Sequence, residues 1–172
     1  MTLFLNMEKI THAIIYILPA YVSNATPTIF GGGKPIDLGK NFFDGKRIFG
    51  DHKTIRGLIS GILFGILTGI LLFLMGLESD FYISLNRAFL LSIGTHIGDL
   101  FGSFIKRRID LEPGAGAPIL DQLGFLIFAL LLTYPVYPLD MGSIIFLVIL
   151  TLILHPLTNF IAYILKLKEK PY

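Results

Sequence analysis

Residues 57–77 read GLISGILFGILTGILLFLMGL, about 20 consecutive residues without a charge. A helix of that length spans about 30 Å, the hydrocarbon thickness of a bilayer. One such block could also be a buried core helix of a soluble protein. The chain, however, has five apolar blocks in 172 residues and no polar shell to cover them. We therefore predict an integral membrane protein.

The composition of the whole chain supports this prediction. Apolar residues make up 53% of the sequence and the mean hydropathy is +0.73, well above the values of soluble domains. The predicted fold class is all-α, a polytopic integral membrane protein with one membrane domain over residues 1–172. Its five transmembrane helices are expected at 11–30, 57–77, 81–105, 118–138 and 142–165. There is no cysteine, which excludes disulfides and thiolate chemistry.

The basic residues are distributed unevenly over the connections between these spans. Twelve of the 14 Lys and Arg residues lie in the loop 31–56, in the loop 106–117 or in the C-terminal tail. Only Lys9 and Arg87 fall on the other side. Under the positive-inside rule, this asymmetry places both loops and the C-terminus in the cytoplasm and the N-terminus outside. We expect a polar cavity that opens to the cytoplasmic side.

Two aspartates, Asp99 and Asp121, lie at the cytoplasmic ends of the third and fourth apolar blocks. A carboxylate inside the bilayer costs about 2.5–3.5 kcal/mol on insertion scales, so it usually has a function. Asp99 belongs to a polar helical face with steps of three and four residues, formed by Ser92, His96, Asp99, Ser103 and Lys106. Two carboxylates near three cations, Lys106 to Arg108, suggest a metal and a phosphorylated ligand.

Two glycine patterns favour close packing of helices instead of a site. Glycine recurs at 57, 61, 65 and 69 in the second block, and at 94, 98 and 102 in the third. His155 and Asn159 share a helical face in the fifth block, next to Pro156. The sequence leaves open whether His96, His155 and Asn159 are structural or functional, and what Asp44 and Asp51 do.

The loop after the first block, GGGKPIDLGKNFFDGKRIFGDHKTIRG at 31–57, is longer and more varied than a plain connector. Glycines next to lysines allow backbone N–H groups to approach phosphate oxygens. The alternative is that the loop only contacts anionic lipid headgroups, an explanation that suits Lys34 and Lys40 better than the segment 44–56.

The run GDLFGSFIKRR at 98–108, followed by Pro113-Gly114 and Asp121, resembles the signature of CDP-diacylglycerol synthases. Their Ser-x-x-Lys-Arg element corresponds to Ser103, Lys106 and Arg107, and Asp99 matches the aspartate just upstream. The segment GDHKTIRG at 50–57 is similar to the family's Lys-Thr-x-x-Gly element, through Lys53, Thr54 and Gly57.

The departures from the bacterial pattern point to the archaeal branch, the CDP-archaeol synthases. Ala115 stands where the bacterial pattern has histidine, and residues 121–124 read DQLG instead of Asp-Arg-x-Asp. The stretch between Lys-Arg and Pro-Gly is also shorter. The resemblance extends from Asn24 to Gln122. It implies a cytidylyltransferase that converts CTP and digeranylgeranylglyceryl phosphate into CDP-archaeol and pyrophosphate.

The residues fit this reaction. The attacking lipid phosphate is already ionised, so catalysis depends on positioning and on neutralising charge rather than on a general base. Asp99 and Asp121 are the expected ligands of Mg²⁺, because the carboxylates of both residues offer the oxygen atoms that this ion prefers. Mn²⁺ could replace Mg²⁺ at such a site. Lys106 and Arg107 complete the expected catalytic set. The expected CTP- and phosphate-binding residues are Asn24, Lys46, Arg47, Lys53, Thr54 and Ser103.

Other functional classes fit the sequence less well. A small ion or lipid transporter could use intramembrane Asp and His residues, but the halves of the chain show no inverted repeat. A lipid-scaffolding protein leaves Asp99 unexplained, and a CDP-alcohol phosphotransferase would need a spaced series of aspartates. The expected partners are CTP, an isoprenoid ether-lipid phosphate and membrane lipids, without nucleic acid; a homodimer is left open. The expected location is the cell membrane, with the active site facing the cytoplasm.

Overall fold

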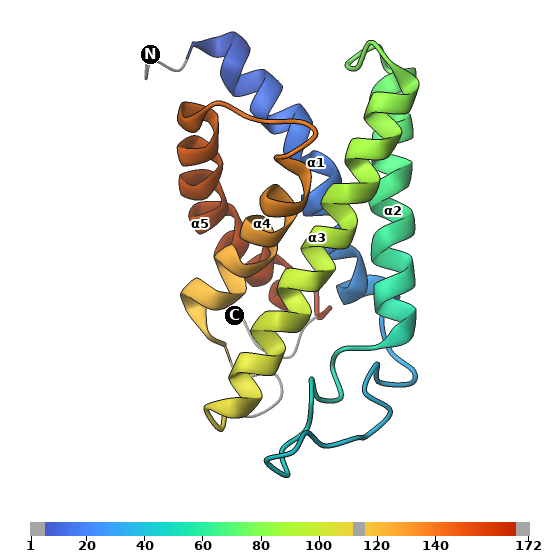
Figure 1. Ribbon diagram of the computed structural model, residues 1–172, viewed down its shortest axis with the longest axis vertical. Helices are drawn as coiled ribbons and strands as arrows, with labels where there is room; N and C mark the ends of the chain where they lie inside the picture. Colours follow the sequence, from blue (N-terminus) through green and yellow to red (C-terminus); the bar gives the residue numbers. More distant parts are fainter. Residues whose placement is uncertain (1–5, 112–115, 168–172) are drawn as a thin grey trace.

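A computed structural model describes residues 6–111 and 116–167 (Figure 1). In this part of the chain there are five α-helices: α1 (Met7–Phe30), α2 (Ile55–Leu74), α3 (Phe81–Arg108), α4 (Pro118–Thr133) and α5 (Met141–Ile164). The predicted all-α class is confirmed. Four of the helices, all except α4, are long and apolar enough to cross a membrane.

The fourth helix is shorter than predicted. The sequence suggested a span over 118–138, but α4 ends at Thr133 after 16 residues. At 1.5 Å per residue it covers about 24 Å, less than a hydrocarbon core. The reason is Pro135 and Pro138, which cannot continue a helix; the N–H of Tyr137 instead donates to the carbonyl of Thr133 in a turn (2.9 Å).

The other predicted boundaries differ by up to four residues because capping groups extend or stop the helices. α1 begins at Met7, four residues early, where the Asn6 side chain accepts the N–H of Lys9 at 2.8 Å. α2 begins at Ile55 behind the cap Thr54 and ends before Gly76, whose φ of 71° starts a turn. α3 continues to Arg108, past the predicted end at residue 105, and α5 is shifted by one residue.

Glycines bring three of the helices into close contact. A Cβ on Gly61 or Gly65 would overlap side chains of α3, and one on Gly98 would overlap the backbone of α4. The packing role predicted for both glycine patterns is therefore confirmed. In Figure 1, α3 and α4 run antiparallel, side by side, and they share the most extensive contact in the bundle.

α1 contacts all four other helices and closes the bundle against α5. The Tyr16 hydroxyl donates to the carbonyl of Tyr137 at 2.7 Å, and the Tyr21 hydroxyl shares a hydrogen bond with Thr151 (2.7 Å). Between the helices lies an apolar core that includes the fully buried side chains Ile17, Leu91, Leu126 and Leu147.

The charged groups collect at one end of this bundle. The connection 31–54 lies at the lower end in Figure 1, beside the last turn of α3 with its three cations. At the upper end, Arg87 forms an ion pair with Glu78 and lies over the ring of Tyr16, 5.0 Å from its centroid. Lys9 pairs there with Asp140 (3.5 Å).

Candidate active site at the basic end of the bundle

Near the middle of α3, the polar face of this helix packs against α1 and α2. Ser92 lies against Gly65, and one turn later His96 lies against Gly61, where only a residue without a side chain leaves room. His96 Nε2 is 3.2 Å from the hydroxyl of Ser23 on α1, and both residues are buried. The first two polar residues of the face are thus packed between helices.

The next residue on the face, Asp99, pairs with Lys53 from the loop. Lys53 Nζ lies 2.6 Å from Asp99 Oδ1 and 2.5 Å from Oδ2, and about a quarter of the Lys53 side chain is exposed. Lys53 directly precedes Thr54, the cap of α2, whose hydroxyl accepts the N–H of Gly57 at 3.1 Å. The similarity to the Lys-Thr-x-x-Gly element therefore corresponds to a local structure: the cap fixes the helix start, and the preceding lysine reaches Asp99.

A second carboxylate–lysine pair lies two turns further along α3. Lys106 Nζ donates to Asp121 Oδ1 (2.7 Å), while Asp121 Oδ2 accepts the N–H of Ala117 at 2.8 Å. Asp121 thus lies in the first turn of α4 and satisfies a free N–H group there. Both predicted metal ligands are at the basic end of the bundle, and each is matched by a cation of the chain itself.

These contacts bear on the predicted metal site. In residues 6–111 and 116–167 no three His, Asp or Glu side chains lie close enough together to hold an ion by themselves. The two aspartates are nevertheless suited to a cation, because each already holds an ammonium group at hydrogen-bonding distance. A hard divalent ion could take the place of these ammonium groups against the carboxylate oxygens.

Arg107 is a buried cation that follows Lys106 in the last turn of α3. Only 7% of its surface is exposed, and its Nε and Nη1 atoms have no hydrogen-bond partner among the described residues. Leaving such donors unpaired costs about 1–3 kcal/mol. An anionic ligand would satisfy both atoms, which is consistent with the role expected for Arg107.

Lys46 and Arg47, two of the expected CTP-binding residues, make ion pairs within the loop and with the end of α3. Lys46 Nζ pairs with Asp110 (2.6 Å) and donates to the carbonyl of Arg108 (3.1 Å). Arg47 pairs with Asp37 (2.6 Å) and Asp51 (2.7 Å). Both cations are therefore engaged in ion pairs that fold the loop and attach it to the end of α3.

Arg108 completes that attachment; it is one of the three cations near the aspartates in the sequence, but it was not among the predicted site residues. Its Nη2 donates to the carbonyl of Arg47 at 2.5 Å, and its Nε is 2.8 Å from Asp44. The guanidinium also lies over the rings of Phe42 and Phe104, 5.2 and 4.5 Å from their centroids. Asp44 and Asp51, whose roles the sequence left open, thus hold Arg108 and Arg47.

Asp37 is the buried centre of the loop, also missed in the sequence. Its carboxylate accepts hydrogen bonds from Arg47 and from the N–H groups of Gly39, Phe49 and Gly50. Burial by itself would raise the pKa of Asp37, but these hydrogen bonds hold that pKa well below its usual range. The available signal was the spacing of aspartates and glycines, which is typical of folded turns.

The remaining predicted residues are more scattered. Ser103 is buried on α3, between the two carboxylate–lysine pairs along the helix. Asn24 lines a cavity of about 230 Å³ between α1 and α5, together with Tyr21, Thr151 and His155. His155 stacks on Phe125 and lies 3.3 Å from Asn159, as their shared helical face predicted. Pro113, Gly114 and Ala115 of the signature lie outside the described residues.

Known proteins resemble this chain over most of its length. A family model described as "CarS-like: CDP-archaeol synthase" matches residues 5–172. The chain is 48% identical to a CDP-archaeol synthase of Thermococcus onnurineus, covering 98% of this chain and 100% of the relative. It is 55% identical to one of Methanococcus maripaludis, covering 91% and 93%.

A solved structure is also similar. It is described as an intramembrane enzyme for archaeal membrane lipid biosynthesis, with 37% identity and a TM-score of 0.80. The similarity covers 87% of this chain and 94% of the other.

Proposed function

This chain belongs to the CDP-archaeol synthase family, and on that premise we propose how its residues carry out the reaction. It is a CTP-using cytidylyltransferase of archaeal membrane-lipid synthesis. The proposed acceptor is the phosphate of 2,3-bis-O-geranylgeranyl-sn-glycerol, and the proposed products are CDP-archaeol and pyrophosphate. The alternative of a small transporter finds no support in the comparisons.

The observation that carries the proposal is the presence of two carboxylate–lysine pairs and one buried, unsatisfied arginine at the same end of α3. Asp99 with Lys53, and Asp121 with Lys106, lie at the end that also holds Arg107. Such a group can accept a polyanion together with a cation: the carboxylates bind the cation, and the lysines released from them bind the phosphates.

The reaction needs little proton chemistry from the protein. An oxygen of the lipid phosphate forms a bond to the α-phosphorus of CTP, while the bond from that phosphorus to the oxygen bridging to the β-phosphorus breaks. The leaving pyrophosphate takes that electron pair. Because one anion attacks another, we propose that Lys53, Lys106 and Arg107 reduce their repulsion and hold them in line.

Mg²⁺, or Mn²⁺ in its place, is the proposed cofactor, with Asp99 and Asp121 as its protein ligands. When bound, the ion would neutralise negative charge on the triphosphate. Thr54 and Ser103 flank the lysine–carboxylate pairs along the chain and remain proposed hydrogen-bond donors to CTP. For Lys46 and Arg47 we propose an indirect role: their ion pairs hold the fold of the loop. Asn24 remains a proposed binding residue, in the cavity between α1 and α5.

The test is product formation by the purified full-length protein in a membrane mimetic. Labelled CTP and the isoprenoid ether-lipid phosphate should give a labelled CDP-lipid and pyrophosphate, and the protein should resist heat better with CTP than without it. Excess EDTA should stop the reaction without unfolding the chain, and Mg²⁺ should restore it. Absence of the CDP-lipid would refute the proposed substrate, and full activity in EDTA would refute the metal.

A further inference from the structure

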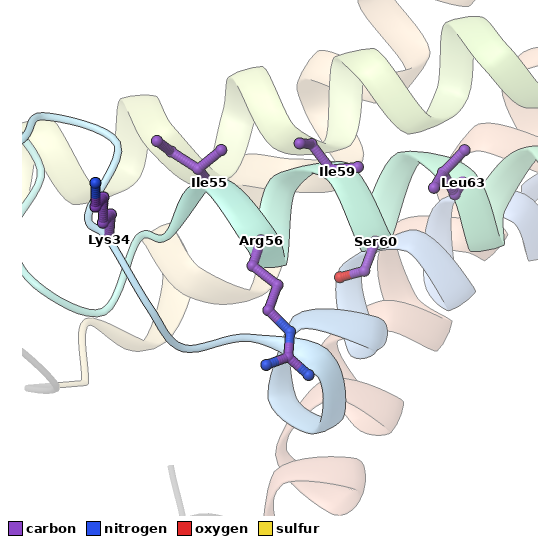
Figure 2. A pocket seen from close by; sticks show the side chains of 6 residues that line it. All are labelled: Lys34, Ile55, Arg56, Ile59, Ser60 and Leu63. Atoms are coloured by element: carbon purple, nitrogen blue, oxygen red, sulfur yellow. The ribbon is translucent and has the colours of Figure 1, made fainter.

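A shallow groove of about 450 Å³ lies on the outer face of α2 and begins next to Lys53 and Thr54 in the chain. It is lined by Lys34, Ile55, Arg56, Ile59, Ser60 and Leu63 (Figure 2). Ile59 lies half a helical turn from Gly57 and Gly61, which are buried against other helices. The groove therefore faces outward from the bundle, where the surrounding membrane would be.

The groove has a cationic end and an apolar floor. Figure 2 shows Lys34 at one end, Arg56 and Ser60 along one side, and the aliphatic side chains Ile55, Ile59 and Leu63 along the other. Ile59 and Leu63 are more than half exposed. Leu63 is seven residues beyond Arg56, about 10 Å deeper along the helix axis. The change from cationic to aliphatic side chains along the groove matches the order of groups in a lipid, from the charged headgroup to the hydrocarbon chain.

The two cations have no negative partner in the part of the chain that the structure describes. Within residues 6–111 and 116–167, Lys34 and Arg56 form no ion pair or side-chain hydrogen bond, in contrast to Lys46, Arg47 and Lys53 of the same loop. None of the described lining residues is acidic. Two unpaired cations at the start of α2, where the helix dipole is positive, favour an anion.

The backbone fixes the position of this cationic end. The N–H of Ile55 donates to the carbonyl of Lys34 at 3.0 Å, and the N–H of Ile36 donates to the carbonyl of Lys53 at 2.7 Å. Lys34 therefore stays next to the first turn of α2. The same pairing holds Lys53, whose side chain reaches inward to Asp99.

We propose that this groove binds a phosphate-bearing lipid of the surrounding membrane, one that is not a substrate. Its headgroup lies between Lys34 and Arg56, and one chain follows Ile59 and Leu63. The bound lipid holds the loop to the membrane surface at the segment that carries Lys53. Each basic residue near a membrane surface favours an anionic lipid by about fivefold, so two give a preference that can be measured.

The chain has no tryptophan, which permits a direct test. Leu63→Trp places one fluorophore on the floor of the groove, and Ile153→Trp places one on the exposed surface of α5 as a control. Each full-length variant is reconstituted in phosphatidylcholine vesicles with a minority of phosphatidylglycerol. In one set of vesicles the phosphatidylglycerol carries brominated chains, which quench tryptophan fluorescence. In a matched set an equal amount of the phosphatidylcholine is brominated instead.

Brominated phosphatidylglycerol should quench the groove fluorophore of Leu63→Trp several-fold more than brominated phosphatidylcholine does, whereas the control fluorophore of Ile153→Trp should show no preference. Adding Lys34→Gln and Arg56→Gln should remove the preference, and Lys40→Gln with Lys166→Gln, two exposed cations outside the groove, should keep it. Equal quenching of the groove fluorophore by both lipids overturns the proposal. The proposal is also overturned if the preference survives Lys34→Gln with Arg56→Gln, or if Lys40→Gln with Lys166→Gln removes it equally. Loss of the preference on adding inorganic phosphate would overturn it too, because the groove would then bind free phosphate instead of a lipid.

Discussion

Asp99 and Asp121 each make contacts that a structural role would explain, and each has a proposed chemical role that the contacts alone do not require. We expect Asp99→Asn and Asp121→Asn to reduce CDP-lipid formation by about a hundredfold or more, because each removes a carboxylate that we propose binds the cation. Thermal stability should stay close to that of the wild type, since the released lysine is partly exposed and asparagine can still accept a hydrogen bond from it.

The matched control is Glu8→Gln, which removes a carboxylate at the start of α1, far from the basic end. It should leave turnover unchanged. If either aspartate variant keeps near wild-type turnover at millimolar Mg²⁺, that residue is not a metal ligand.

Substituting Arg107 should preserve or increase the stability of the protein while it removes the activity. Arg107→Met removes a buried guanidinium whose Nε and Nη1 have no partner among the described residues. Without CTP, the free energy of unfolding should therefore hold or rise, by up to about 1–3 kcal/mol. The protection that CTP gives against heat should nearly disappear, together with turnover.

Arg108→Met is the adjacent control: the Nε and Nη1 of Arg108 also have no hydrogen-bond partner among the described residues, but unlike Arg107 it has an ion pair, a carbonyl acceptor for Nη2 and two ring contacts. It should lower the free energy of unfolding. A loss of stability in Arg107→Met, equal to that in Arg108→Met, would mean that Arg107 is structural.

Among the larger elements, the loop 31–54 stands out because it is folded, although it contains neither a helix nor an extended strand in the described structure. Its stability should depend on Asp37. The folded-state pKa of Asp37 is lowered, so its contribution is fully present above the ordinary carboxyl pKa of about 3.9 and is lost as the pH falls toward the folded value.

Asp37→Asn should therefore destabilise the protein at pH 7 by about 1.5–3 kcal/mol, raise the KM for CTP, and affect kcat less. The difference in stability from the wild type should shrink as the pH falls below about 4. Asp80→Asn, at an exposed helix cap, is a comparison whose KM should not change. A difference that is constant from pH 7 to pH 3 would mean that the Asp37 charge is not what stabilises the loop.

The helices could be predicted from sequence much better than the loop could. Apolar blocks and glycine spacing reflect local periodicity, and this is why α2 and the contact between Gly98 and α4 agree with expectation. The end of α4 was missed because a stretch as apolar as 134–138 hides the effect of its two prolines.

The partners of the charged residues could not be predicted in the same way. Whether Lys46 or Lys53 faces the site depends on how one loop folds against the end of α3, through contacts such as Lys46 to Asp110 that join residues far apart in the sequence. The motif similarity identified Lys53 because that lysine directly precedes a helix cap. Arg108 lacked such a local signal, and for Asp37 the signal was limited to the spacing of aspartates and glycines in the loop.

At the scale of the whole molecule, the unequal charge of the two ends should determine orientation in the membrane. The described cations lie mostly at the end with the loop 31–54 and the end of α3, whereas at the other end Lys9 and Arg87 are both neutralised by ion pairs. This arrangement favours placing the basic end in the cytoplasm. CTP is a cytoplasmic nucleotide, so the proposed function requires the same orientation.

Single cysteines can test this orientation without background, because the chain has no cysteine of its own. Phe43→Cys introduces a thiol in the loop, at a residue that is 99% exposed, and Ser79→Cys introduces one in the exposed turn between α2 and α3. In intact cells, a membrane-impermeant maleimide should label the Ser79→Cys variant and spare the Phe43→Cys variant until the membrane is permeabilised. Labelling of the loop thiol from outside would place the carboxylate–lysine pairs on the side without CTP, and the proposed reaction could not then proceed at this site.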